Sequence, residues 1–266
     1  MTADSTPTDG AGRVRTHLAR VRSETDRLVE LVTGADPGTP VTTCPGWTLA
    51  DLVTHVGTTH RWVTHILEHR LQERISSREV PSGLADGRSG DAAWLAEGAG
   101  SLLATLSSTD PDLPVWTWGS GRSAAWWARR MACELLVHRV DAELALGVEP
   151  DVPVAVALDA TDELLTNLPH ARWVTRRLAE LDAVGATLHL HASPVEGEPP
   201  AAGEWTLTQG PDGALTCARG HAKADVAVRG PAGDLLLMVY GRRFADTLTV
   251  HGDRAFLDRW LERAAL

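Results

Sequence analysis

The segment from Ser123 to Leu146 constrains the fold more than any other part of the chain, because its pattern is helical and it is apolar almost all the way round. A surface helix keeps its apolar residues in one stripe, whereas a buried helix carries them on every side. Gly147 follows where a left-handed helix cap is usual, and Pro150 and Pro153 come next. We therefore predict a buried helix here, which needs other helices around it.

Three segments upstream have the periodicity of such helices, and they cover residues 14–32, 48–70 and 92–106. Thr48 and Asp51 have the spacing of a capping box, with Asp in place of the usual Glu, and this predicts where the second helix begins. Four helices within about 150 residues are typical of an up-and-down bundle.

After the bundle the pattern changes to a mixture of helices and alternating segments that indicate strands. The predicted helices are residues 154–167, 233–240 and 254–264, and the predicted strands are residues 186–192, 205–208, 222–228 and 247–251. This order predicts a small α+β domain. We expect a first domain over residues 1–155 and a second over residues 156–266.

Composition argues against several classes of protein. The 266 residues are 43% apolar, which suits a folded chain, and a net charge of −10 would repel nucleic acid. The N-terminal residues lack the apolar stretch of a secretory signal, and no window reaches the length of a membrane span, so we expect a cytoplasmic protein that does not bind membranes. Cys44, Cys133 and Cys217 never have CxxC spacing, and we interpret Cys44 and Cys133 as small buried hydrophobes.

The buried helix carries polar residues that need partners. At about 100° per residue, one narrow stripe of the helix contains Trp127, Met131, Glu134, His138 and Asp141. Glu134 and His138 stand one turn apart, where both side chains reach a common point. A buried carboxylate beside a buried imidazole is unfavourable unless each has a partner.

A divalent cation is one partner that satisfies both side chains, because carboxylate oxygen and neutral imidazole nitrogen are normal zinc ligands. His55 lies at the margin of the apolar face of the second helix and is placed to point into the bundle. Asp141, one turn beyond His138, is placed to orient an imidazole from behind. The sequence suggests no other competing cluster, so we expect about one metal per chain.

Simpler interpretations stay open for these residues. One interpretation is that Glu134 and His138 form only a hydrogen-bonded pair that is partly open to solvent. Another is that His55 is an interior histidine whose hydrogen bonds are satisfied. His65 and His69 are interpreted as a solvated pair near a helix end. His189 and His191 share one face of a predicted strand, and we interpret them as ordinary surface residues.

Two motifs resemble the mycothiol-dependent maleylpyruvate isomerase family. They are the run VTTCPGWTLADLVTH at residues 41–55 and the run ELLVHRVD at residues 134–141. Residues 234–243 and 250–253 are similar to the smaller C-terminal domain of that family. The resemblance implies a DinB-like four-helix bundle followed by a sterol-carrier-like α+β domain. It also implies that His55, Glu134 and His138 bind a catalytic metal, with zinc the expected ion.

The same resemblance implies a function. A metal-bound thiolate of the cosubstrate mycothiol adds to a small electrophile, a carboxylate such as maleylpyruvate, and the double bond passes from cis to trans. Arg242 or Arg243 is expected to enter the active site and hold the substrate carboxylate. Two alternatives remain, a mycothiol S-transferase and a non-catalytic metal or ligand-binding module. The chain is expected to be a monomer or a homodimer.

Overall fold

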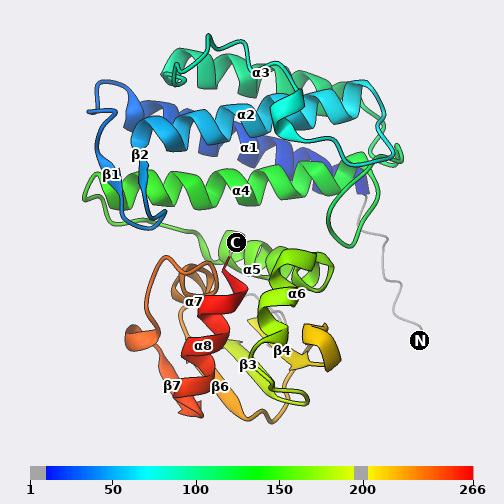
Figure 1. Cartoon of the computed structure of the whole chain (residues 1–266), viewed down its shortest axis with the longest axis vertical. Coiled ribbons are helices and arrows are strands. Elements are labelled where there is room, and N and C mark those ends of the chain that lie inside the picture. Colours follow the sequence, from blue (N-terminus) through cyan, green and yellow to red (C-terminus); the bar gives the residue numbers. More distant parts are fainter. Residues whose placement is uncertain (1–9, 195–202, 266) are drawn as a thin grey trace, which may run out of the picture. The chain divides into compact units, whose positions relative to one another are not determined.

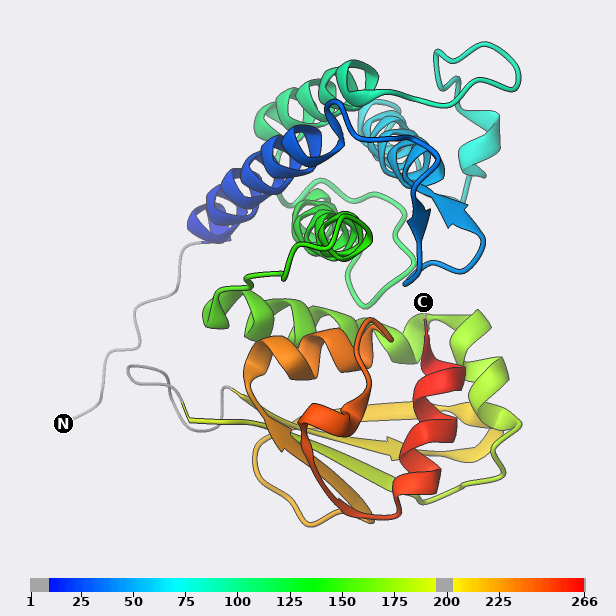
Figure 2. The same ribbon diagram turned by 90° about the vertical axis from the view of Figure 1, so that its left-hand side faces the viewer.

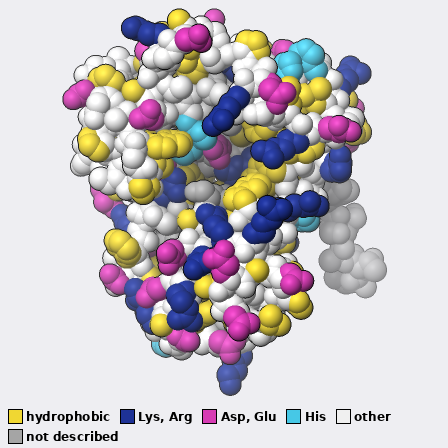
Figure 3. Space-filling model, in the orientation of Figure 1, with side chains coloured by type: hydrophobic (Ala, Val, Ile, Leu, Met, Phe, Trp, Pro, Cys, Tyr) yellow, Lys and Arg dark blue, Asp and Glu magenta, His cyan; other side chains and the backbone are white. Residues whose placement is uncertain are grey.

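The computed structural model describes residues 10–194 and 203–265, which fall into two compact units (Figure 1). The first unit consists of the chain up to Thr117 and of Gly121–Pro150. The second consists of Trp118–Ser120 and of the chain from Asp151 onwards. Over the described residues, no helix combines the length and the apolar character that crossing a bilayer requires. Figure 3 shows acidic and basic side chains intermixed on the face that it draws.

The first unit is a bundle of four helices with a small hairpin between its first two helices. The helices are α1 (Gly10–Val32), α2 (Leu49–Glu68), α3 (Ala92–Ser108) and α4 (Ala124–Ala145), and the hairpin strands are β1 (Pro40–Val41) and β2 (Trp47–Thr48). Helix α4 packs against α1 and α2, and α3 packs against the other side of the same pair. This architecture confirms the predicted bundle.

The ends of α2 and α4 follow the signals in the sequence. The Thr48 hydroxyl accepts a hydrogen bond from the Asp51 amide at 3.3 Å, and the Asp51 carboxylate accepts one from the Thr48 amide at 2.8 Å. This reciprocal pair is the predicted capping box, and it fixes the first turn of α2. Gly147 has a φ of +71°, which an L side chain rarely adopts, and α4 ends just before it.

Helix α4 is buried along most of its length, as its sequence predicted. Its apolar side chains include Leu135, Leu136 and Val140, each 0% exposed. It also buries Arg139, whose guanidinium donates to Glu24 of α1 at 2.8 Å. A buried charge is unfavourable unless it is paired, and this ion pair links α1 to α4.

The second unit is an α+β domain built on one five-stranded sheet of order β5-β4-β3-β6-β7. Its strands are β3 (Thr187–Ala192), β4 (Glu204–Gln209), β5 (Leu215–Arg219), β6 (Val226–Gly230) and β7 (Thr249–Gly252). Its helices are α5 (Val154–Asn167), α6 (Arg172–Ala179), α7 (Ala232–Val239) and α8 (Arg254–Ala264). Only the central pair β3 and β6 is parallel, and the other neighbours are antiparallel.

The two faces of this sheet differ. Leu188 and Leu190 of β3 are buried on the face that the helices cover, and Figure 2 shows α5 and α7 over the sheet. Successive residues of a strand point to opposite faces, so His189 and His191 lie on the other face. The sheet therefore places two histidines side by side, away from its helices.

The predictions for this domain missed some elements. Helix α6 and strand β5 were not predicted, and β6 begins at Val226 rather than at residue 222. Asp225 explains the later start, because its carboxylate accepts hydrogen bonds from the Thr187 amide at 2.9 Å and from the Thr187 hydroxyl at 2.7 Å. These bonds tie the start of β3 to the residue just before β6, in the centre of the sheet. The predicted fold class is nevertheless confirmed.

Candidate metal centre

Three side chains from α2 and α4 come together in the bundle: His55, Glu134 and His138, which we call the bundle cluster. Glu134 and His138 are one turn apart on the buried helix, and the capping box sets the register that brings His55 to them. His138 is 7% exposed, whereas the side chain of His55 is 38% exposed. The cluster therefore has one buried side and one side open to solvent.

One carboxylate oxygen of Glu134 contacts a ring nitrogen of each of the two histidines. Its Oε1 lies 3.3 Å from Nε2 of His55 and 3.2 Å from Nε2 of His138. The other oxygen, Oε2, accepts a hydrogen bond at 2.5 Å from Arg130, which is 2% exposed and one turn earlier on α4. Arg130 therefore leaves a single carboxylate oxygen facing the two histidines.

The charge of Glu134 is stabilised by its neighbours. Burial alone would raise the pKa of Glu134, but the charge of Arg130 and hydrogen bonds from His138 and His55 outweigh it and hold that pKa well below its usual range. The carboxylate is therefore ionised at neutral pH, as a metal ligand must be.

His138 is oriented from behind by Asp141, which is fully buried. Nδ1 of His138 donates to Oδ2 of Asp141 at 2.9 Å, and Thr43 and Cys44 donate to the same carboxylate at 2.6 and 3.4 Å. Burial would lower the pKa of His138, but the bonds to Asp141, Cys44 and Glu134 raise it well above its usual value. Asp141 thereby fixes which nitrogen of His138 faces the cluster.

An aromatic ring covers part of the cluster. Trp47, the last residue of the PGW turn, has its ring centroid 4.9 Å from that of His55 and 6.3 Å from that of His138. The two imidazole rings meet edge to face, with centroids 4.9 Å apart. The hairpin before α2 therefore supplies one wall of the site.

Three residues that contribute to this site were not predicted from the sequence, and a fourth was interpreted wrongly. Arg130, Thr43 and Trp47 were not singled out, although Arg130 stands one turn before Glu134 and the other two lie in the quoted motif. The interpretation of Cys44 as a small buried hydrophobe was wrong, because its thiol is half-buried and bonds to Asp141. Cys133 is 0% exposed, so its predicted burial is confirmed.

The two arginines expected in the active site belong to the second unit and follow α7. Arg242 donates to the carbonyl of Tyr240 at 2.6 Å, and Arg243 forms an ion pair with Asp234 at 2.6 Å. These contacts place both guanidinium groups near the end of α7. Their role in catalysis stays a prediction.

The expectation that no other cluster competes was wrong, because a second group of possible ligands lies on the sheet of the second unit. It consists of His189, His191, Glu204 and His221, and we call it the sheet cluster. The interpretation of His189 as a surface residue was also wrong, since it is only 3% exposed. The partners of the two histidines come from β4 and from the loop after β5.

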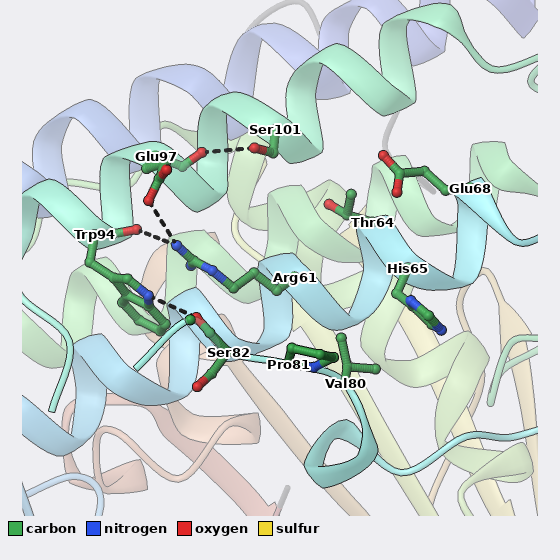
Figure 4. A pocket seen from close by; sticks show the side chains of 11 residues that line it. Arg61, Thr64, His65, Glu68, Val80, Pro81, Ser82, Trp94, Glu97 and Ser101 are labelled. Atoms are coloured by element: carbon green, nitrogen blue, oxygen red, sulfur yellow. Dashed lines mark hydrogen bonds and ion pairs between the residues drawn. The ribbon is translucent and has the colours of Figure 1, made fainter. Parts of the chain in front are cut away.

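A pocket of about 590 Å³ lies elsewhere on the bundle, between α2 and α3 (Figure 4). Arg61 reaches across it to the Trp94 carbonyl at 3.0 Å and to Glu97 at 3.5 Å, and its guanidinium lies over the Trp94 ring. His65, interpreted as solvated, is half-buried in its wall. No residue of the bundle cluster lines this pocket, so it does not identify a substrate site beside the cluster.

Comparisons with known proteins cover both units. Residues 18–143 match the family model of the mycothiol maleylpyruvate isomerase N-terminal domain, and residues 155–259 match that of the MDMPI C-terminal domain. No curated protein sequence matches the chain.

Among solved structures, the mycothiol-dependent maleylpyruvate isomerase superposes with a TM-score of 0.58 at 16% identity, over 89% of this chain and 92% of that one. A histidine-to-alanine mutant of the same isomerase gives a TM-score of 0.59 with the same identity and coverage. At this level of identity, the likeness shows a shared fold.

Proposed function

The chain belongs to the mycothiol maleylpyruvate isomerase family, and we propose that it is a zinc-dependent enzyme that uses mycothiol to convert a small electrophile from cis to trans. The proposed ligands are His55, Glu134 and His138. In the reducing cytoplasm, where we propose that the enzyme works, a low-molecular-weight thiol stays reduced and available.

The observation that carries the proposal is the approach of two imidazole nitrogens to one carboxylate oxygen, at 3.3 and 3.2 Å. Ligand atoms of a tetrahedral zinc ion with bonds of about 2.1 Å lie about 3.4 Å apart, so the donor spacing fits. Three protein ligands leave a position for a thiol or substrate, which is typical of catalytic rather than structural zinc. A divalent metal held there would favour the thiolate form of a bound thiol near neutral pH.

The surrounding residues have separate tasks in this proposal. Arg130 occupies Oε2 of Glu134, so that Oε1 alone faces the imidazoles. Asp141 accepts the Nδ1 proton of His138 and so keeps Nε2 directed at the cluster, and Thr43 holds Asp141 in place. Trp47 shields one side of the two imidazoles from water.

The proposed reaction is an addition followed by an elimination. The sulfur of mycothiol adds to the activated carbon–carbon double bond, the resulting single bond rotates, and the sulfur leaves as the trans double bond forms, so the thiol is regenerated. The substrate is expected to be a carboxylate, and Arg242 or Arg243 is the proposed partner of that group. An arginine suits this task because its planar fork pairs with both carboxylate oxygens.

The test is to incubate the zinc-loaded full chain with mycothiol and maleylpyruvate, and to separate the products by chromatography with mass detection. The isomerase proposal expects a trans product with the mass of the substrate. A product that carries the added mass of mycothiol would instead identify an S-transferase. Zinc bound at the cluster without turnover of any electrophile in a panel would identify a binding module. His138→Ala is the control that removes a proposed ligand.

A further inference from the structure

We propose that the sheet cluster is a second metal site, in which His189, His191, Glu204 and His221 hold a divalent ion of the zinc class. It shares no residue with the bundle cluster and lies in the other unit. The inference is therefore independent of the proposed function.

Sheet register brings the first three residues together. His191 is paired with Glu204 across β3 and β4, and His189 is paired with Thr206 in the same ladder. Paired residues point to the same face of a sheet, so both histidines and the carboxylate share the face away from the helices. His221 arrives from the loop after β5, which is fastened to β4 by the hydrogen bond from the Gly220 amide to the Glu204 carbonyl at 3.0 Å.

The donor atoms converge on the carboxylate of Glu204. Its Oε2 lies 2.8 Å from Nδ1 of His221 and 3.4 Å from Nε2 of His189, and its Oε1 lies 3.9 Å from Nδ1 of His191. One ligand atom from each of the four residues lies within 4.8 Å of all the others. Tetrahedral zinc needs separations of about 3.4 Å, so small side-chain rotations are enough to close the site.

His189 gives further support, because one of its ring nitrogens is buried and, among the described residues, makes no hydrogen bond of good geometry. Nδ1 is fixed by the Thr206 hydroxyl at 2.9 Å, while the buried Nε2 faces Oε2 of Glu204 at 3.4 Å without the geometry of a hydrogen bond. Zinc-bound histidines usually have this arrangement, in which a polar group holds one nitrogen and the other binds the metal.

The three imidazole rings do not stack on one another. Their ring centroids lie 5.3 to 6.1 Å apart, and each pair of ring planes is nearly perpendicular, at 81° to 89°. Three nitrogens and one carboxylate oxygen form a complete tetrahedral set for zinc. The side chain of His221 is 75% exposed, so an ion can enter from solvent. Four protein ligands make this a closed site, and its expected effect is to fasten β3, β4 and the loop after β5 together.

The test compares zinc content in four full-length proteins after dialysis against zinc and removal of the excess. The proteins are the wild type, His138→Ala, His221→Ala and His251→Ala. His251 is the matched control, because it is exposed, lies on β7 of the same sheet, and belongs to neither cluster. We expect two zinc ions per chain in the wild type and in His251→Ala, and one in each of the other two.

The His138→Ala protein also permits a second measurement, since zinc can then act only through the sheet cluster. Zinc at about 100 times its dissociation constant should raise the unfolding temperature of this protein by several degrees. The rise should vanish when His221→Ala is added. A His138→Ala protein that holds no zinc would overturn the second site. An unchanged zinc content both in His221→Ala and in a fifth protein, His191→Ala, measured in the same way, would also overturn it.

Discussion

The bundle cluster and the sheet cluster have the same types of donor atom, but different kinds of neighbouring group hold their proposed ligands in place. In the bundle cluster, the charged Arg130 and Asp141 hold Glu134 and His138 from behind. In the sheet cluster, a neutral hydroxyl on Thr206 holds His189. The two clusters therefore differ in the pKa of a histidine: that of His138 is raised well above its usual value, while that of His189 is lowered.

This contrast indicates different tasks. Because a histidine must lose its proton to bind a metal, the raised pKa of His138 should make metal binding at the bundle cluster depend more on pH than binding at the sheet cluster. The bundle cluster offers three ligands and keeps a position for a substrate, while the sheet cluster offers four and closes around the ion. We therefore expect chemistry at the first cluster and stabilisation at the second.

The strongest test of this contrast is to remove one histidine from each cluster. His138→Ala should lower kcat/KM for the mycothiol-dependent reaction by more than about 100-fold, because losing a ligand costs more than losing a group behind it. His221→Ala should lower zinc content and thermal stability, with kcat/KM close to the wild-type value. Steady-state kinetics and elemental analysis on the same preparations check both. Equal losses of turnover would break the division of tasks.

The next largest effect concerns the arginines after α7. Through one of them the second unit would take part in catalysis, although the metal of the sheet cluster would not. Arg242→Ala or Arg243→Ala should lower turnover roughly a hundredfold, the usual effect of losing one charged transition-state contact, while zinc content stays unchanged. Because Arg243 is paired with Asp234, Asp234→Asn is a matched control that keeps the arginine and frees it from that charge. Full activity in both alanine variants would confine catalysis to the bundle.

A smaller effect is expected from the groups behind the ligands. Asp141→Asn should weaken zinc binding at the bundle cluster by about 10- to 100-fold, because it removes the charge that holds His138. Thr206→Val should weaken binding at the sheet cluster by about tenfold, since it removes only a neutral hydroxyl. Competition with a chelator measures both affinities. A larger loss for Thr206→Val would reverse the comparison.

The sequence reveals one cluster and conceals the other because of how each is built. Glu134 and His138 lie one turn apart on a single helix, so spacing along the chain shows that they meet. His189 and His191 show only that they share a strand face. Their partner Glu204 is brought to them by the register of β3 and β4, and His221 is brought by a loop. Neither contact can be predicted from the spacing of residues along the chain.

The fold shows the same limit. Helices with strong periodicity and caps, such as α2 and α4, were predicted closely. Helix α6 was missed because its sequence, RWVTRRLA, has three arginines and few apolar residues to show a periodicity. Strand β5 was missed because most of its side chains are half-buried or exposed, which gives little alternation to detect. The start of β6 depends on a hydrogen bond between Asp225 and Thr187, which are far apart in the chain. Long-range contacts of this kind leave no local pattern.

The last prediction concerns His60 of α2, a buried imidazole that belongs to neither cluster. It is 1% exposed, and within the described part of the chain neither of its ring nitrogens has a hydrogen-bond partner. Unlike Nε2 of His189, which faces other ligands, these nitrogens lie in no group of possible metal ligands among the described residues. If His60 only fills space, His60→Leu should raise the free energy of unfolding by about 1–3 kcal/mol at pH 7.5, because it removes unsatisfied polar atoms.

The effect of His60 on stability should also depend on pH, with a definite sign. Burial first, and then the charge of Arg61, lower the pKa of His60 from 6.5 to about 3 in the folded protein. The unfolded chain therefore binds a proton below pH 6.5 while the folded chain does not, so stability falls as the pH falls. Between pH 7.5 and 5.5 this group should remove about 1.4 kcal/mol from the wild type and nothing from His60→Leu. Urea unfolding of both proteins at the two pH values measures the difference. A destabilised His60→Leu whose pH dependence matches the wild type would show that His60, like His189, is kept buried for a partner.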